Sequence, residues 1–260
     1  MGLFDRLFGK KASRIEVPAA EPAPVAAPIR PAEPAPQPKS AADTAREEEG
    51  LRAMTELLDE MVLAVAQALA AQGQNNPINL VYVMAAVAGQ VAQAGAIRSR
   101  ALAGEPLEAP HVVAVEATNG RTYLFGDAIG MALIGEVTDP GVLWQSAGTS
   151  GLPFDQQIIN ELFSHAASTV GSADFGRPRF GVELPPDLTI DAAVRHIGTI
   201  VPSLTKRGVG QNLWTRMTAL ATRHAILAAA REHDMEALGH VALDAAVAGS
   251  RIRFEDIAKG

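Results

Sequence analysis

INLVYVMAAVAGQVAQAGAI, residues 78–97, is a stretch of twenty residues without a formal charge. Its length would suit a membrane span, which needs about 20 apolar residues. However, it contains three amide side chains that hydrocarbon solvates poorly, those of Asn79, Gln90 and Gln93. Ala85 and Gly89 form a small-x-x-x-small pair, which allows helices to approach closely. We therefore expect residues 79–102 to form a buried helix in a helical core.

A second helical pattern comes just before this stretch. Apolar residues recur there every three or four positions, at Leu51, Met54, Leu58, Met61, Val65 and Leu69. Asp43 or Thr44 can cap a helix over residues 44–72, and Gly73 ends it. The turn residues Asn75, Asn76 and Pro77 then separate the two helices. We expect an antiparallel pair of helices.

The pattern changes to a two-residue period over residues 111–125. Val113 and Val115 alternate with other residues, and the pair Asn119-Gly120 is typical of a tight hairpin turn. Thr122 to Phe125 would be the returning strand. Asp127 can cap a short helix that ends near Leu133.

The rest of the chain is mostly helical by pattern. A short strand is expected near 142–145, inside a loop-rich stretch, and helices are expected over 153–170 and from Thr189 or Asp191 to 204. Residues 209–248 predict further helix with a break near Asp234. The predicted fold class is α+β: a predominantly α-helical globular domain with a small antiparallel β-hairpin.

The composition excludes several functional classes. The 260 residues include no cysteine, so disulfides, thiol nucleophiles and Cys-based metal sites are ruled out. The formal charge of −7 argues against a nucleic-acid partner, because binding phosphates requires clustered Lys and Arg. The N-terminus lacks the apolar core of a signal peptide. We expect a cytoplasmic protein without a cofactor or a bound metal.

The N-terminal region divides into two parts before the globular domain of residues 44–260. Residues 1–11 form a short amphipathic segment whose docking residues would be Leu3, Phe4, Leu7, Phe8, Lys10 and Lys11. Residues 12–43 contain eight prolines between positions 18 and 38, so we expect a disordered Pro/Ala-rich linker. A segment held away from its domain suits a membrane surface or a groove on a partner. A plain disordered tail is the alternative.

Four residues are candidates for catalysis. Ser150 belongs to Gly148-Thr149-Ser150-Gly151, interpreted as a loop before the 153–170 helix, although the spacing matches neither a phosphate loop nor a hydrolase elbow. Glu161 and His165 are four residues apart and could act as a general-base pair. Asp191, with Arg195 and His196, is another such group. Both patterns are also common on helix surfaces.

Three further patterns favour structural interpretations. His233, Glu236, His240 and Asp244 share a helix face, but the two histidines are too far apart for one ion. Arg177 and Arg179 stand between Phe175 and Phe180, which suits base stacking but offers little charge. His224 lies on an apolar stripe and suggests a hydrogen-bonded core histidine.

Two hypotheses for the function follow. In the first, a non-enzymatic adaptor or regulatory protein binds a protein partner or a second copy through its helical domain. Its N-terminal segment docks it reversibly to a partner or to the inner face of the membrane. In the second, an enzyme or small-ligand binder uses Ser150, Glu161, His165 and Asp191. A cleft that collects two or more of these would favour the second hypothesis, and their dispersal would favour the first.

Overall fold

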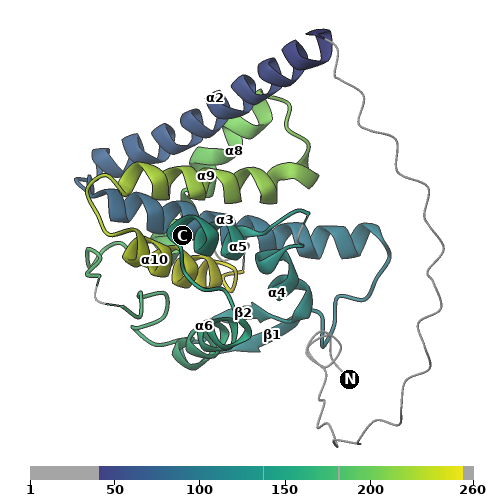
Figure 1. Ribbon diagram of the computed structural model, residues 1–260. Coiled ribbons are helices and arrows are strands. Elements are labelled where there is room, and N and C mark those ends of the chain that lie inside the picture. The colour runs from purple at the N-terminus through teal and green to yellow at the C-terminus, as the bar shows by residue number, and fades with distance from the viewer. Residues whose placement is uncertain (1–40, 137, 181, 254–260) are drawn as a thin grey trace, which may run out of the picture. The chain divides into compact units, whose positions relative to one another are not determined.

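The computed structural model describes residues 41–136, 138–180 and 182–253 (Figure 1). The chain divides into two compact units, residues 1–52 and 53–260. The described part of the first unit is the beginning of helix α2, Ala41–Ala71, which continues into the second unit. The predicted amphipathic segment and most of the predicted linker lie outside the described residues.

The second unit is predominantly helical and contains one antiparallel hairpin, as predicted. After α2 come α3 (Pro77–Leu102), β1 (Val113–Glu116), β2 (Thr122–Phe125), α4 (Asp127–Ile134), α5 (Val142–Ser150) and α6 (Gln156–Thr169). They are followed by α7 (Ile190–Arg195), α8 (Ile197–Lys206), the 3-10 helix η1 (Gln211–Leu213), α9 (Trp214–Ala229) and α10 (Met235–Gly249).

Helix α3 is the centre of the domain, and the prediction that it is buried is confirmed. It begins with Pro77 and is capped by Asn76, whose side chain accepts a hydrogen bond from the Ile78 amide at 2.9 Å. Every residue from Val81 to Gln93 is buried. Helices α10, α9, α4 and α7 pack around it. By length and composition α3 could cross a membrane, but 72% of its apolar window is buried inside the domain.

The contact between α3 and α10 depends on small residues. A Cβ atom at Gly89 would overlap the backbone carbonyl of Ala246, and one at Gly249 would overlap that of Ala86. The two backbones therefore touch directly. The buried Gln93 side chain forms a hydrogen bond across this contact: its amide donates to the Ser250 carbonyl at 2.7 Å. Alanine and glycine thus serve helix packing here.

The hairpin has the predicted antiparallel pairing, with Val113 opposite Phe125 and Glu116 opposite Thr122. Gly120 has a φ of 75°, a conformation that glycine adopts without strain. The chain following α10 adds to the edge of this hairpin: the Leu124 amide donates to the Arg251 carbonyl at 2.9 Å. The hairpin is therefore tied to the end of the core helix α10.

Two local predictions were wrong. Residues 142–145 form the first turn of α5 instead of a strand, because Val142, Leu143, Ser146 and Ala147 bury one face at helical spacing. The expected single helix up to 204 is two helices, α7 and α8, which meet at His196. Two predicted features are confirmed: Thr189 caps α7, and the break at Asp234 is real, since Asp234 caps α10.

Candidate functional site

Ser150 lies in the last turn of α5, so the loop interpretation of Gly148-Thr149-Ser150-Gly151 was wrong. Gly151 ends the helix with a φ of 72°. The Ser150 side chain is buried, and its hydroxyl donates to the Ser146 carbonyl at 2.7 Å. It also packs against the backbone of α10, because a Cβ at Gly239 would overlap the Ser150 hydroxyl. Ser150 therefore has a structural role between two helices.

Asp191 is also engaged by the protein itself. Its two carboxylate oxygens accept hydrogen bonds from the Arg121 guanidinium at 2.6 and 2.7 Å. This bidentate pair joins α7 to the β-hairpin. Asp191 therefore pairs with Arg121 and not with Arg195 or His196, which the sequence suggested. His196 is buried at the junction of α7 and α8, and this burial lowers the pKa of its imidazole.

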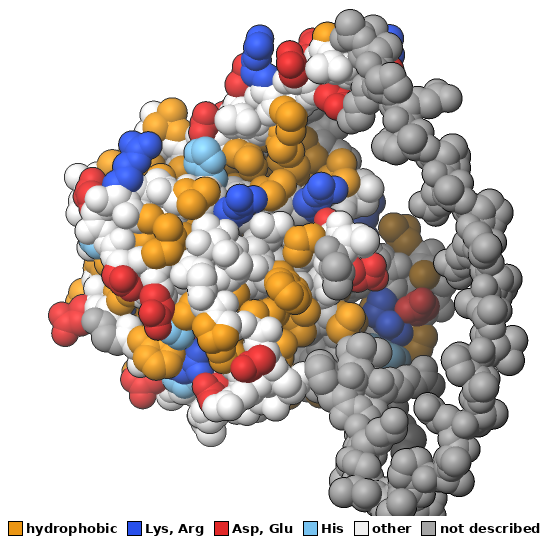
Figure 2. Space-filling view, in the orientation of Figure 1, with side chains coloured by type: hydrophobic (Ala, Val, Ile, Leu, Met, Phe, Trp, Pro, Cys, Tyr) orange, Lys and Arg blue, Asp and Glu red, His pale blue; other side chains and the backbone are white. Residues whose placement is uncertain are grey.

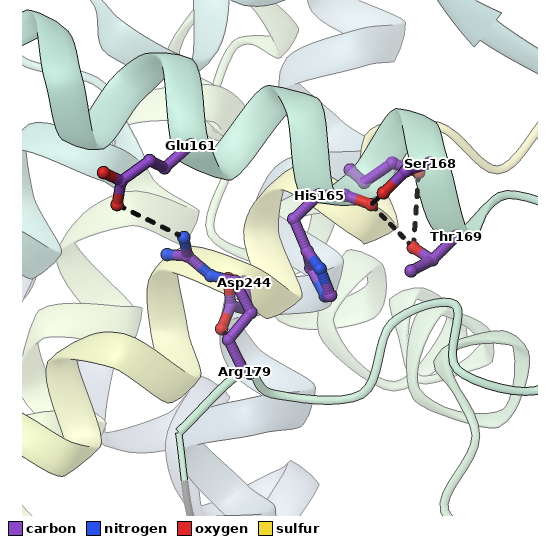
Figure 3. Close-up of polar contacts among 7 residues, drawn as sticks. Glu161, His165, Ser168, Thr169, Arg179 and Asp244 are labelled. Carbon is purple, nitrogen blue, oxygen red and sulfur yellow. Dashed lines mark hydrogen bonds and ion pairs between the residues drawn. The ribbon is translucent and has the colours of Figure 1, made fainter.

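Glu161 and His165 do lie close to other polar groups. We use the term Arg179 cluster for Glu161 and His165 of α6, Arg179 and Phe180 of the following connection, and His240 and Asp244 of α10. Figure 3 shows Arg179 between Glu161 and Asp244, with His165 beside them. The Arg179 Nε lies 2.8 Å from an Asp244 oxygen, and a terminal nitrogen lies 3.9 Å from a Glu161 oxygen.

The Asp244–Arg179 contact is the strongest part of this cluster. Asp244 is 5% exposed and accepts from both the Arg179 side chain and the Arg179 backbone amide, the latter at 2.9 Å. Burial raises the pKa of the Asp244 carboxyl, and the contacts with Arg179 oppose that effect. A buried carboxylate with this partner fixes the connection onto α10.

The rest of the Arg179 cluster is aromatic and imidazole surface. The rings of Phe180 and His240 have centroids 4.2 Å apart, and the Arg179 guanidinium lies 5.2 Å from the Phe180 centroid. His240 Nε2 lies 3.9 Å from a Glu236 oxygen. Among the described residues, no three His, Asp or Glu side chains gather closely enough to hold a metal ion.

The connection that carries Arg179 is anchored at two further points. The buried Tyr82 hydroxyl of α3 donates to the Gly176 carbonyl at 2.8 Å, and burial raises the pKa of that hydroxyl. The Arg177 guanidinium donates to the Pro186 carbonyl at 3.2 Å. Arg177 and Arg179 therefore bind their own chain, as expected of a packed loop. The Arg179 cluster is a clamp that holds the segment from Gly176 to Phe180 against the helical core.

His224 differs from the core histidine that was predicted. Its side chain is 38% exposed, and its Nε2 lies 2.8 Å from an Asp59 oxygen. This ion-pair contact joins α9 to α2 near the surface. Figure 2 shows hydrophobic side chains among Lys and Arg side chains over the α9 region.

A groove on another part of the domain is lined by segments far apart in the sequence. The α3–α4–α9 groove is the hollow between Gly95–Leu102 of α3, α4 with Gly135, Glu136 and residues 139–141, and residues 211–216. Its volume is about 780 Å³, within the range of ligand sites. Thr215 packs directly over Gly95, which brings the start of α9 against α3.

Several polar side chains of this groove have no recorded partner within the described chain. They are those of Arg98, Gln211, Asn212 and Thr215. Arg216 forms one long contact, 3.7 Å between its Nε and an Asp139 oxygen, and both side chains are more than half exposed. Arg100 pairs with Glu105 at 2.9 Å. Polar groups that converge on a hollow and remain unpaired are suited to bind polar atoms of a ligand.

No protein-family model matches the sequence, and neither the curated proteins nor the solved structures contain a significant match. Physical features of the chain itself must therefore indicate its function.

The sequence interpretation did not find the groove. Arg98 and Arg216 are more than 100 positions apart, and each looks like an ordinary helix-surface charge. The one available signal was the change inside α3, where the uncharged stretch ends and two arginines follow within four residues.

Proposed function

We propose that this chain is a non-enzymatic adaptor or regulatory protein. Its helical domain binds a protein partner in the α3–α4–α9 groove, and its N-terminal amphipathic segment docks the chain reversibly to a membrane surface or to a second partner. The protein acts in the cytoplasm, with peripheral attachment at the inner face of the membrane.

The groove is the observation that carries this proposal. It is open and is formed by three segments, and four of its polar side chains make no contact with the described part of the chain. The candidates for catalysis support the same conclusion by their dispersal. Ser150 and Asp191 are engaged in separate structural contacts. Glu161 and His165 lie beside Arg179, which binds Asp244 and contacts Glu161. An adaptor needs surfaces, and this domain offers one.

The N-terminal sequence supports the docking part of the proposal. Leu3, Phe4, Leu7 and Phe8 form one apolar stripe, and Lys10 and Lys11 follow it. Each basic residue near an anionic surface contributes about 1 kcal/mol at moderate salt. A segment with four apolar side chains would bind weakly as one copy, which suits a reversible attachment.

The experiment is co-sedimentation of the full chain with vesicles that contain anionic lipid, at low and moderate salt. The wild type is expected to sediment, more so at low salt, whereas Phe4→Glu/Phe8→Glu is expected to stay in solution. Val25→Glu/Ile29→Glu adds the same charge within the proline-rich stretch and is expected to sediment like the wild type. A wild type that stays in solution at both salt concentrations would remove the membrane from this proposal and leave the segment as a protein-docking peptide.

A further inference from the structure

We infer that the α3–α4–α9 groove takes an extended peptide segment with acidic side chains along one edge. This inference rests on the proposed adaptor function, since it names the class of partner segment that the domain would bind.

The lining of the groove favours an extended chain. The lining includes six residues with little or no side chain: Gly95, Ala96, Ala128, Ala132, Gly135 and Gly141. Small residues let the backbone of a ligand approach closely. Met131 adds a flexible apolar surface, of the kind that adapts to different side chains. An open hollow with such a lining suits the backbone of an extended peptide.

The charges of the groove are arranged on two sides. Arg98 and Arg216 belong to the side where α9 begins against α3, because Arg98 lies one turn after Gly95 and Arg216 follows Thr215. Glu136 and Asp139 belong to the connection after α4. The chain as a whole carries a formal charge of −7, so an exposed pair of arginines is a local exception.

The arginine side of the groove decides the class of the ligand. Arg98 has no recorded partner within the described chain, and the contact of Arg216 with Asp139 is long and exposed to water. A pair of that kind contributes little and is readily exchanged. Guanidinium groups bind carboxylates with two parallel hydrogen bonds. A segment whose carboxylates face α3 and α9 would therefore satisfy both arginines.

The test is selection of peptides from a random displayed library on the full-length protein, followed by anisotropy titration of the enriched sequences. Selected peptides are expected to be rich in Asp and Glu. Arg98→Glu/Arg216→Glu is expected to weaken their binding by about tenfold or more, because it reverses the charge of one side. Arg223→Glu removes an exposed arginine two turns further along α9 and is expected to change Kd by less than about twofold.

Four results would overturn the inference. The first is failure to select any peptide, and the second is selection without acidic enrichment or with full binding to Arg98→Glu/Arg216→Glu. The third is a wild-type dimer that this double variant abolishes, which would assign the groove to a second copy. The fourth is loss of vesicle binding in the double variant, which would assign it to lipid headgroups. The vesicle experiment on Phe4 and Phe8 is independent, so failure of the groove and failure of membrane docking are distinguishable.

Discussion

The two parts of helix α3 behave differently although they belong to one continuous helix. From Val81 to Gln93 every residue is buried, and the backbone of α10 touches that of α3 at Gly89. From Ala94 to Leu102 the residues are exposed or half-buried, and several line the groove. The first part holds the domain together. The second part remains available: Arg100 pairs with Glu105, but the exposed Arg98 has no contact within the described chain.

The largest effect is expected at Asp244, on the helix that packs against the buried part. Asp244→Ala leaves the Arg179 guanidinium without its buried partner, which is expected to lower the free energy of unfolding by about 3 to 5 kcal/mol. Glu161→Ala removes the distant, exposed partner of the same arginine and is expected to cost about 0.5 kcal/mol or less. Urea denaturation measures both, and equal losses would contradict the clamp.

A slightly smaller loss of unfolding free energy is expected when a methyl group is added at the contact between α3 and α10. Gly89→Ala places a methyl group against the Ala246 carbonyl, so the helices must separate, at a cost of about 2 to 3 kcal/mol. Gly148→Ala meets no atom within 4 Å and is expected to stabilise the protein by about 0.5 to 1 kcal/mol through helix propensity. Thermal unfolding of both variants tests this. A neutral Gly89→Ala would show that the two backbones do not touch.

The hydroxyl of Tyr82 tests the anchoring of Gly176 and its neighbours to the buried part of α3. Tyr82→Phe leaves the Gly176 carbonyl without its donor and is expected to lower the free energy of unfolding by about 1 kcal/mol. Tyr123→Phe removes a hydroxyl that accepts a hydrogen bond from the exposed Asn119, and water can replace that acceptor. Tyr123→Phe is therefore expected to lower the free energy of unfolding by less than Tyr82→Phe does. Urea denaturation of both variants measures this, and a larger loss for Tyr123→Phe would contradict the anchoring role of Tyr82.

A pH dependence is expected from His196, at the end of the helix α7 that packs on α3. Burial lowers its pKa in the folded protein below the ordinary value of 6.5. As the pH falls through 6.5, the unfolded chain takes up the proton first, so this contribution to stability is present above 6.5 and is lost below it. Between pH 7.5 and 5.5, the unfolding free energy of wild type should fall more steeply than that of His196→Gln. Parallel slopes would argue against a buried neutral imidazole.

The smallest effect on stability is expected in the exposed part of α3. Arg98→Glu/Arg216→Glu changes two exposed side chains whose one contact is the long Arg216–Asp139 pair, and it should leave the free energy of unfolding within about 0.5 kcal/mol of the wild type. Thermal unfolding of this variant is the control for the peptide-binding measurement. A loss above about 2 kcal/mol would mean that these arginines support the fold.

The sequence predicted those parts of the fold that depend on local signals. The uncharged stretch identified α3, Asn119-Gly120 identified the hairpin, and Asp234 identified a helix cap. The strand prediction for residues 142–145 was wrong because Val-Leu-Trp is typical of a strand. The sequence does not show that these residues belong to a helix that packs on α9 and α10. The Arg179–Asp244 contact spans 65 positions, and the groove unites three remote segments. Contacts of that kind follow from the packing of helices, so no linear spacing could indicate them.

The most direct measurement is amide hydrogen exchange of the full-length protein with and without an acidic peptide selected on it. Exchange in the free protein is expected to be slowest over Val81–Gln93 of α3 and faster over residues 95–102. The peptide is expected to slow exchange at residues 95–102, in α4 and at residues 211–216, and to leave the buried part unchanged. Protection that instead appears on the Arg179 cluster, or nowhere in the domain, would contradict the central claim that the open end of α3 is the binding face.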